Sequence, residues 1–127
     1  MSRVVLDASA VLVLLNQEAG SDGIAPLIPQ SVISAVNLSE VIAKLADAGI
    51  PEASIHQILK HLNLEVIAFN DQQALTTGLL RPLTKSQGLS LGDRACLALG
   101  MSLNLPVITS DQTWSRLSLA IEIRVIR

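Results

Sequence analysis

Four carboxylates stand where predicted strands give way to predicted helices. They occur in the runs Val4-Val5-Leu6-Asp7, Asn37-Leu38-Ser39-Glu40, Leu91-Gly92-Asp93-Arg94 and Ile108-Thr109-Ser110-Asp111. In an alternating α/β fold, the carboxyl ends of the strands and the amino ends of the helices share one edge of the sheet, so we expect these acids to converge. Clustered carboxylates repel one another unless a cation lies among them, and oxygen ligands suit Mg²⁺ or Mn²⁺. The pattern predicts metal-assisted phosphodiester chemistry.

Helix capping explains each acid singly. The spacings Asn37-x-x-Glu40 and Ser90-x-x-Asp93 both fit a capping box, in which the acid bonds back to the start of its helix. Asp7 and Asp111 each follow a strand and precede a helix, which is where N-cap residues stand.

Capping does not explain why four acids meet at one sheet edge. Asp7 follows a strand that we expect to be buried, where an ionised carboxylate costs several kcal/mol unless it is compensated. The hydroxyls of Ser9, Thr109 and Ser110 lie beside these acids in the sequence and are candidates to orient carboxylates or bound water. We therefore favour a shared metal site formed by Asp7, Glu40, Asp93 and Asp111.

The elements that must position these acids alternate between strand and helix. We expect strands at 3–6, 31–35, 64–69, 106–109 and 121–126. We expect helices at 8–16, from 37 to the glycine at 49, from 51 to 62, at 71–86 with a kink or break at Pro82, at 90–103 and at 111–117, and a loop at 18–22. This order predicts a three-layer α/β/α sandwich, with a central five-stranded, mostly parallel sheet and a single domain over residues 1–127.

Composition limits the classes of partner. Half of the 127 residues are apolar and the mean hydropathy is +0.49, so we expect part of the apolar surface to cover an oligomer or partner interface. Phe69 and Trp114 are the only aromatic residues, which leaves little material for base stacking. The net charge of −2 becomes mildly basic once the four acids are set aside, so charge neither supports nor excludes a nucleic-acid substrate.

The single cysteine and the absence of export signals favour the cytoplasm. Cys96 lies in an apolar helical run and is expected to be a small buried residue without a disulfide partner. Asp7 interrupts the first apolar run, and no small-residue cleavage site follows it. No apolar stretch approaches the length that spans a membrane, so we expect a soluble protein without membrane contact.

The motifs resemble, in order, those of a PIN domain. They are Val5-Leu6-Asp7-Ala8-Ser9-Ala10, Asn37-Leu38-Ser39-Glu40-Val41, the run from Gly88 to Ala98, and Thr109-Ser110-Asp111-x-x-Trp114. The chain is specifically similar to the VapC-type ribonuclease toxins of type II toxin–antitoxin pairs, and all four acidic positions of the family are occupied. The resemblance implies a metal-dependent endoribonuclease that forms a homodimer and is inhibited by a small VapB-like antitoxin. Transfer RNA is the substrate that it suggests first, with messenger RNA second.

Basic residues near the motifs are candidates for substrate contacts. Arg94 adjoins Asp93, where it has two interpretations: contact with a phosphate of the substrate, or orientation of the neighbouring carboxylate. Arg81 and Lys85 form a basic pair four residues apart, which fits contact with an RNA backbone or a plain solvated helix face.

Other titratable residues have ordinary structural explanations. Lys44 follows Glu40 by four residues, the usual spacing of a helix-surface ion pair. His56 and His61 are five residues apart, so they do not share a helix face in the way that a pair of metal ligands would.

Three other functions compete with a ribonuclease toxin. Phosphoryl transfer of the haloacid-dehalogenase type also starts from a strand ending in Asp, but it needs a second acid where this chain has Ser9. Neither a Gly-Lys-Ser/Thr phosphate loop nor a Gly-x-Gly-x-x-Gly motif occurs. A non-catalytic PIN-like interaction module, in which the acids only cap helices, and a housekeeping PIN nuclease without an antitoxin both remain alternatives.

Overall fold

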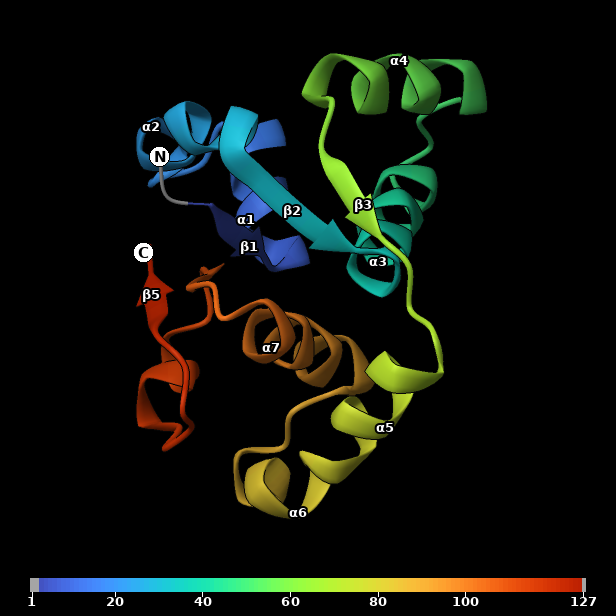
Figure 1. Cartoon of the computed structure of the whole chain (residues 1–127). Coiled ribbons are helices and arrows are strands. Elements are labelled where there is room, and N and C mark those ends of the chain that lie inside the picture. Colours follow the sequence, from blue (N-terminus) through green and yellow to red (C-terminus); the bar gives the residue numbers. More distant parts are fainter. Residues whose placement is uncertain (1–2, 127) are drawn as a thin grey trace.

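The computed structural model describes residues 3–126, and its centre is a wholly parallel five-stranded sheet (Figure 1). The strands are β1 (Val4–Leu6), β2 (Ser31–Ser34), β3 (Glu65–Ile67), β4 (Val107–Thr109) and β5 (Ile123–Val125). Their order across the sheet is β3-β2-β1-β4-β5, and all four pairings are parallel. The chain moves outward from β1 to β3 and then returns to the far side of β1. The strand order therefore reverses between β1 and β4, the place where open α/β sheets form a crevice at the carboxyl ends of their strands.

Helices cover both faces of the sheet. They are α1 (Ala8–Leu15), α2 (Ser21–Ile24), α3 (Ala35–Asp47), α4 (Glu52–Leu62), α5 (Asp71–Leu79), α6 (Arg81–Thr84) and α7 (Leu91–Leu103), with 3₁₀ helices η1 (Ala25–Gln30), η2 (Lys85–Gln87) and η3 (Gln112–Arg116). One apolar cluster joins the sheet to α1, α2, α3 and α4, and a second joins it to α7, η3 and the end of α5. These are the three layers that the sequence predicts.

Alternation along the central strand explains why it needs two covering layers. Val4 and Leu6 belong to the first cluster, while Val5 between them belongs to the second. Successive side chains of a strand point to opposite faces, so a continuous apolar run is stable only when both faces are buried. None of the helices formed by residues 3–126 has the length and apolar character that crossing a bilayer requires.

Several predicted boundaries are wrong, and the reasons are local. The helix predicted from 37 starts two residues earlier, because Ser34 is its N-cap and accepts a 3.2 Å hydrogen bond from the amide of Val36. The predicted loop at 18–22 is confirmed as far as Gly20, but α2 starts at Ser21 and η1 follows it. The break predicted at Pro82 is confirmed, since α6 starts with this proline in its first turn. The predicted helix at 111–117 is the 3₁₀ helix η3.

Candidate active site

Asp7 lies at the central strand end and is almost completely buried. It occupies the N-cap position of α1, but its side chain makes no capping hydrogen bond, so the capping explanation fails for it. Instead, Ser9 Oγ and Thr109 Oγ1 donate hydrogen bonds of 2.7 and 3.0 Å to Asp7 Oδ2. Both bonds end on the same oxygen, and only 5 % of the residue is exposed. The carboxylate is thus held in a fixed orientation.

The same hydroxyls connect Asp7 to the end of β4. The amide of Ser110 donates to Ser9 Oγ at 3.0 Å, and the amide of Asp111 donates to Thr109 Oγ1 at 3.1 Å. The structure therefore brings the three predicted hydroxyl-bearing residues together around the first acid, and it ties the two strand ends at the point where strand order reverses.

Glu40 extends from α3 and is held by Asn37. Asn37 Nδ2 donates to Glu40 Oε1 at 2.9 Å and also to the backbone carbonyl of Gly92 at 3.0 Å. The capping box predicted for Asn37 and Glu40 is wrong, because Ser34 caps α3 and Asn37 lies inside the helix. Asn37 is fully buried and its Oδ1 has no hydrogen-bond partner, a cost that a purely structural residue would not need to bear.

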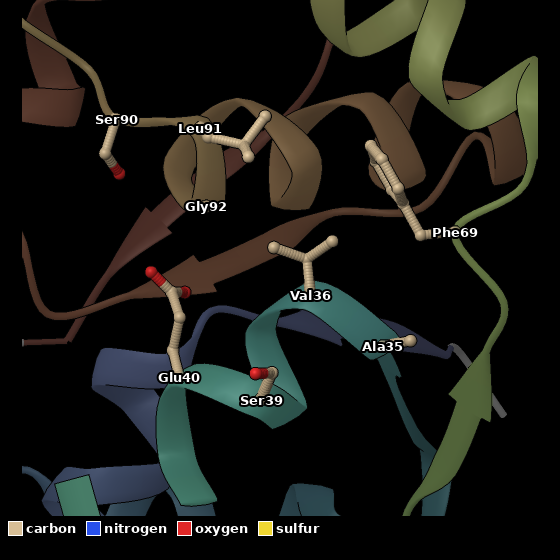
Figure 2. A pocket seen from close by; sticks show the side chains of 8 residues that line it. All are labelled: Ala35, Val36, Ser39, Glu40, Phe69, Ser90, Leu91 and Gly92. Carbon is tan, nitrogen blue, oxygen red and sulfur yellow. The ribbon is translucent and has the colours of Figure 1, made fainter. Parts of the chain in front are cut away.

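Gly92 makes room for the Glu40 carboxylate at the start of α7. A Cβ atom built on Gly92 would lie 2.5 Å from the carboxyl carbon of Glu40, far inside van der Waals contact. Figure 2 shows the Glu40 side chain directed from α3 toward this turn of α7. The sequence does not single out Gly92 or give Asn37 this role. The only signal is a glycine immediately before an acid in the first turn of a helix.

Asp93 combines a structural role with a position at the site. Its Oδ2 accepts a 2.9 Å hydrogen bond from the amide of Ser90, and its own amide donates to Ser90 Oγ at 3.1 Å. This is the predicted capping box, and it is fully formed. The carboxylate is fixed by one oxygen, which leaves Oδ1 for another interaction.

Asp111 stands apart from the other three acids. Its Oδ1 accepts hydrogen bonds of 2.9 and 2.7 Å from the amide and the hydroxyl of Thr113, so it caps η3 as an N-cap residue. Its connection to the site is the bond between its amide and Thr109 Oγ1.

Asp7, Glu40 and Asp93 line one hollow of about 200 Å³ (its other lining residues are Ala8, Ser9, Leu12 and Lys44). The pKa of Asp7 is raised from 3.8 to about 6, mainly by burial and also by the negative charges of Asp93 and Glu40. The hydrogen bonds from Ser9 and Thr109 offset part of this rise. A positive charge in the hollow would stabilise the ionised form of Asp7.

The acids fit a hydrated divalent cation. Within residues 3–126, no three carboxylate, imidazole or thiol side chains come close enough together to enclose an ion by direct ligation alone. Mg²⁺ usually retains several waters and takes one or two carboxylates directly, so a looser set of oxygen ligands is compatible with it. The buried Asp7 and the half-buried Glu40 and Asp93 supply the negative charge that such an ion needs.

Lys44 lies at the rim of this hollow and does not form the predicted ion pair. Among residues 3–126, the ion pairs are Arg3 with Glu65, His56 with Glu52 and Arg124 with Glu122. Lys44 lines the hollow without reaching Glu40, so its ammonium group remains available to a negatively charged ligand.

The other basic candidates lie elsewhere. Arg94 extends away from Asp93, and its Nη1 donates to the carbonyl of Thr77 at 3.1 Å, which links α7 to α5. Arg81 and Lys85 are exposed on α6 and η2, and neither lines the hollow that holds the acids.

Comparison with known families identifies the fold. The model of the PIN domain matches residues 4–119. The chain belongs to the PIN domain family. No sequence match to a curated protein was found.

Solved structures of VapBC complexes share this PIN fold over whole chains. The chain is similar to DNA-bound VapBC from Salmonella typhimurium (TM-score 0.77, 21 % identity, 100 % of both chains covered). It is also similar to VapBC2 from Rickettsia felis bound to a promoter DNA fragment (0.74, 17 %, 98 % of both chains). VapBC-5 from Mycobacterium tuberculosis, a member of the VapBC family of toxin–antitoxin systems, matches with TM-score 0.65 and 25 % identity over 100 % of this chain and 99 % of that one. The predicted resemblance is confirmed, and since PIN domains of this class are nucleases, it supports a nuclease role.

The raised pKa of Asp7 predicts a stability that falls with pH. Between pH 3.8 and about 6 the folded state binds this proton more tightly than the unfolded state, so stability decreases as pH rises through that window. At 1.36 kcal/mol per pKa unit, the full cost above pH 6 is about 3 kcal/mol. In urea titrations with EDTA, Asp7→Asn should raise the free energy of unfolding at pH 7.5 by up to that amount, and most of the gain should vanish at pH 4. An equal gain at both pH values would contradict this origin.

Gly92→Ala should displace the Glu40 carboxylate without unfolding the domain, because the obstructed group is the end of a flexible side chain. We expect Mn²⁺ affinity, measured by isothermal titration, to fall about 10-fold or more. The matched control is Gly78→Ala in the last turn of α5, where an added Cβ meets nothing within 4 Å. It should leave Mn²⁺ affinity unchanged and stabilise the helix by about 0.5–1 kcal/mol. Equal affinity in the two variants would exclude a role for Glu40 in cation binding.

Proposed function

We propose that this single PIN domain is a Mg²⁺- or Mn²⁺-dependent endoribonuclease and the toxin of a toxin–antitoxin pair. The observation that carries the proposal is the hollow shared by Asp7, Glu40 and Asp93, three carboxylates from separate parts of the chain. Capping explains Asp93 and Asp111, but it explains neither Asp7 nor Glu40, which make no capping bond. A non-catalytic module would have no use for these two repelling acids.

Asp7, Glu40 and Asp93 would hold the cation, directly or through water, and Asp111 would contribute through water. When bound, the cation polarises the phosphodiester and lowers the pKa of a water molecule, which is the nucleophile of such hydrolyses. The chain itself orients Asp7 through Ser9 and Thr109, and it orients Glu40 through Asn37. Hydrolysis of this kind does not use the 2′-hydroxyl, so the products would carry a 5′-phosphate and a 3′-hydroxyl.

Lys44 supplies the positive charge that an RNA substrate needs beside these acids. It lines the same hollow, and no ion pair among residues 3–126 engages it. Its ammonium group would contact a phosphate next to the scissile one. Transfer RNA in the cytoplasm is the substrate class that we propose first.

A homodimer would cover the exposed leucines of α5 and α6. Leu75 and Leu79 are exposed one turn apart on α5, and Leu83 is exposed on α6 after the break; we call these three leucines the exposed stripe. An unpartnered stripe of this kind is typical of an interface between protein chains.

Two hollows along α1 support inhibition by a small antitoxin. Ala8 and Leu12 of α1 line the acid hollow, and Leu15 lines a mostly apolar hollow of about 400 Å³ against α4. An amphipathic segment lying along α1 would fill the apolar hollow and bring a basic side chain, most suitably Arg, into the acid hollow. Such an arginine would replace the charge of the cation.

Removal of one carboxylate should abolish cleavage while the fold survives. Asp7→Asn and Asp93→Asn should each lower the cleavage rate of total RNA at least about 100-fold, because each removes charge that holds the cation. Asp22→Asn, an exposed acid of α2, is the matched control and should retain full activity. Circular dichroism checks folding, and excess EDTA should stop the wild-type protein. Undiminished cleavage in EDTA, or full activity of both variants, would refute the mechanism.

The antitoxin proposal predicts a co-purifying partner encoded next to this gene. The complex should show suppressed RNA cleavage, and overexpression of this chain alone should arrest growth unless it carries Asp7→Asn. Gln57→Trp, exposed beside the hollow between α1 and α4, should weaken the complex. The same substitution at exposed Gln72 of α5 is the control and should leave it intact. A harmless chain without a neighbouring small reading frame would contradict the toxin role and leave a housekeeping nuclease.

A further inference from the structure

A second hollow adjoins the acids on the other side of Glu40. Its volume is about 570 Å³, and it lies between the amino ends of α3 and α7 and the connection from β3 to α5 (Figure 2). The residues that line it are Ala35, Val36, Ser39, Glu40, Phe69, Ser90, Leu91 and Gly92. Glu40 is the one residue that this hollow shares with the hollow of Asp7 and Asp93. A substrate whose phosphate lies at the acids therefore has its neighbouring nucleoside next to this second hollow.

Phe69 gives this hollow the only accessible aromatic ring among residues 3–126. The other aromatic residue, Trp114 of η3, is 0 % exposed and packs in the core, whereas Phe69 is partly exposed. Figure 2 shows the ring of Phe69 directed toward α7, across from Val36 and Leu91. Leu91 is 54 % exposed although it opens a helix that is otherwise buried at most positions. Together these apolar side chains form much of the lining of the hollow.

The remaining lining residues suit the edge of a nucleobase or its sugar. Ser90 Oγ accepts a hydrogen bond from the Asp93 amide, so its own hydrogen is still available to donate. Ser39 is exposed on α3, one residue before Glu40. A base has two apolar faces and polar edges, and a hollow with a ring, two aliphatic side chains and two hydroxyls matches both kinds of surface.

We propose that this hollow is a nucleobase subsite, in which Phe69 stacks on the base adjacent to the scissile phosphate. The proposal rests on the ribonuclease function above and deepens it by assigning a substrate contact. A protein segment is the less favoured occupant, because the hollow shares Glu40 with the acid hollow and so adjoins the place where the scissile phosphate would bind. The exposed stripe of Leu75, Leu79 and Leu83 lies on α5 and α6, outside its lining. A single stacking ring would make cleavage faster when a base is present next to the scissile phosphate, but it would not recognise a longer sequence.

The test uses RNA oligonucleotides with one abasic nucleotide on either side of a mapped cleavage site. Stacking of one base on an aromatic ring is worth about 1–3 kcal/mol, so wild-type kcat/KM should fall about 10-fold or more when the stacked base is removed. Phe69→Ala should cleave the intact oligonucleotide as slowly as the wild type cleaves the abasic one, and the abasic one no more slowly than that. Phe69→Tyr, which keeps the ring, should restore the difference. Leu103→Ala, at the exposed carboxyl end of α7 and outside the lining of both hollows, is the control and should behave as the wild type.

Each other outcome refutes a particular claim. Wild-type cleavage that ignores both abasic sites overturns the subsite but not the ribonuclease. An equal loss for Phe69→Ala on intact and abasic oligonucleotides shows that the ring acts without the base and overturns the subsite. Light scattering that shows dissociation of a wild-type dimer by Phe69→Ala assigns the hollow to a second copy of the chain. Absence of cleavage of every oligonucleotide by the wild type, with Mn²⁺ present, removes the proposed function and the subsite together.

Discussion

Three carboxylates that repel one another lie near the carboxyl end of the central strand, and the surrounding side chains must hold them in place against this repulsion. Asp7 is buried at the end of β1, and burial together with Asp93 and Glu40 raises its pKa to about 6. An arrangement that is costly in the free protein persists only when the surrounding structure holds it in place. Two hydroxyls fix one oxygen of Asp7, and the buried amide of Asn37 fixes Glu40. Such positioning is what a cation site requires, since the protein must supply the charge before the ion arrives.

The sheet topology explains why these residues meet although they are far apart in the sequence. Strand order reverses between β1 and β4, so the chain segments that leave these two strands separate to opposite sides and open a crevice. Hydrogen bonds among Asp7, Ser9 and Thr109 link the ends of β1 and β4 at the base of this crevice. The amino ends of α3 and α7 lie at its rim. Asn37 then connects the two helices by bonding to the carbonyl of Gly92.

The sequence predicted the parts of this arrangement that depend on local pattern. Apolar β-branched runs located the strands, and the residue that follows each strand located Asp7 and Asp111. It failed where two signals competed or where the contact was distant. Ser34 and Asn37 are both good N-caps three residues apart, and only packing decides that Ser34 caps the helix. Gly92 matters because of a carboxylate on another helix. Lys44 lines the acid hollow but is in none of the ion pairs of residues 3–126, although the spacing favoured a pair with Glu40. Neither fact is visible in a local window.

Capping and cation binding are compatible functions of one acid, and Asp93 illustrates how. Its Oδ2 accepts the Ser90 amide, which restricts the side chain to one rotamer and reduces the entropy that ligand binding would otherwise cost. Asp93 lines the same hollow as Asp7, so its other oxygen is left for a ligand in that hollow. A negative charge in the first turn of a helix is also favoured by the helix dipole, and Asp93 stands in the first turn of α7. Asp93, which the sequence explains most simply as a cap, is therefore already held in place for binding a ligand. A capping motif at a strand–helix junction does not argue against a functional site there.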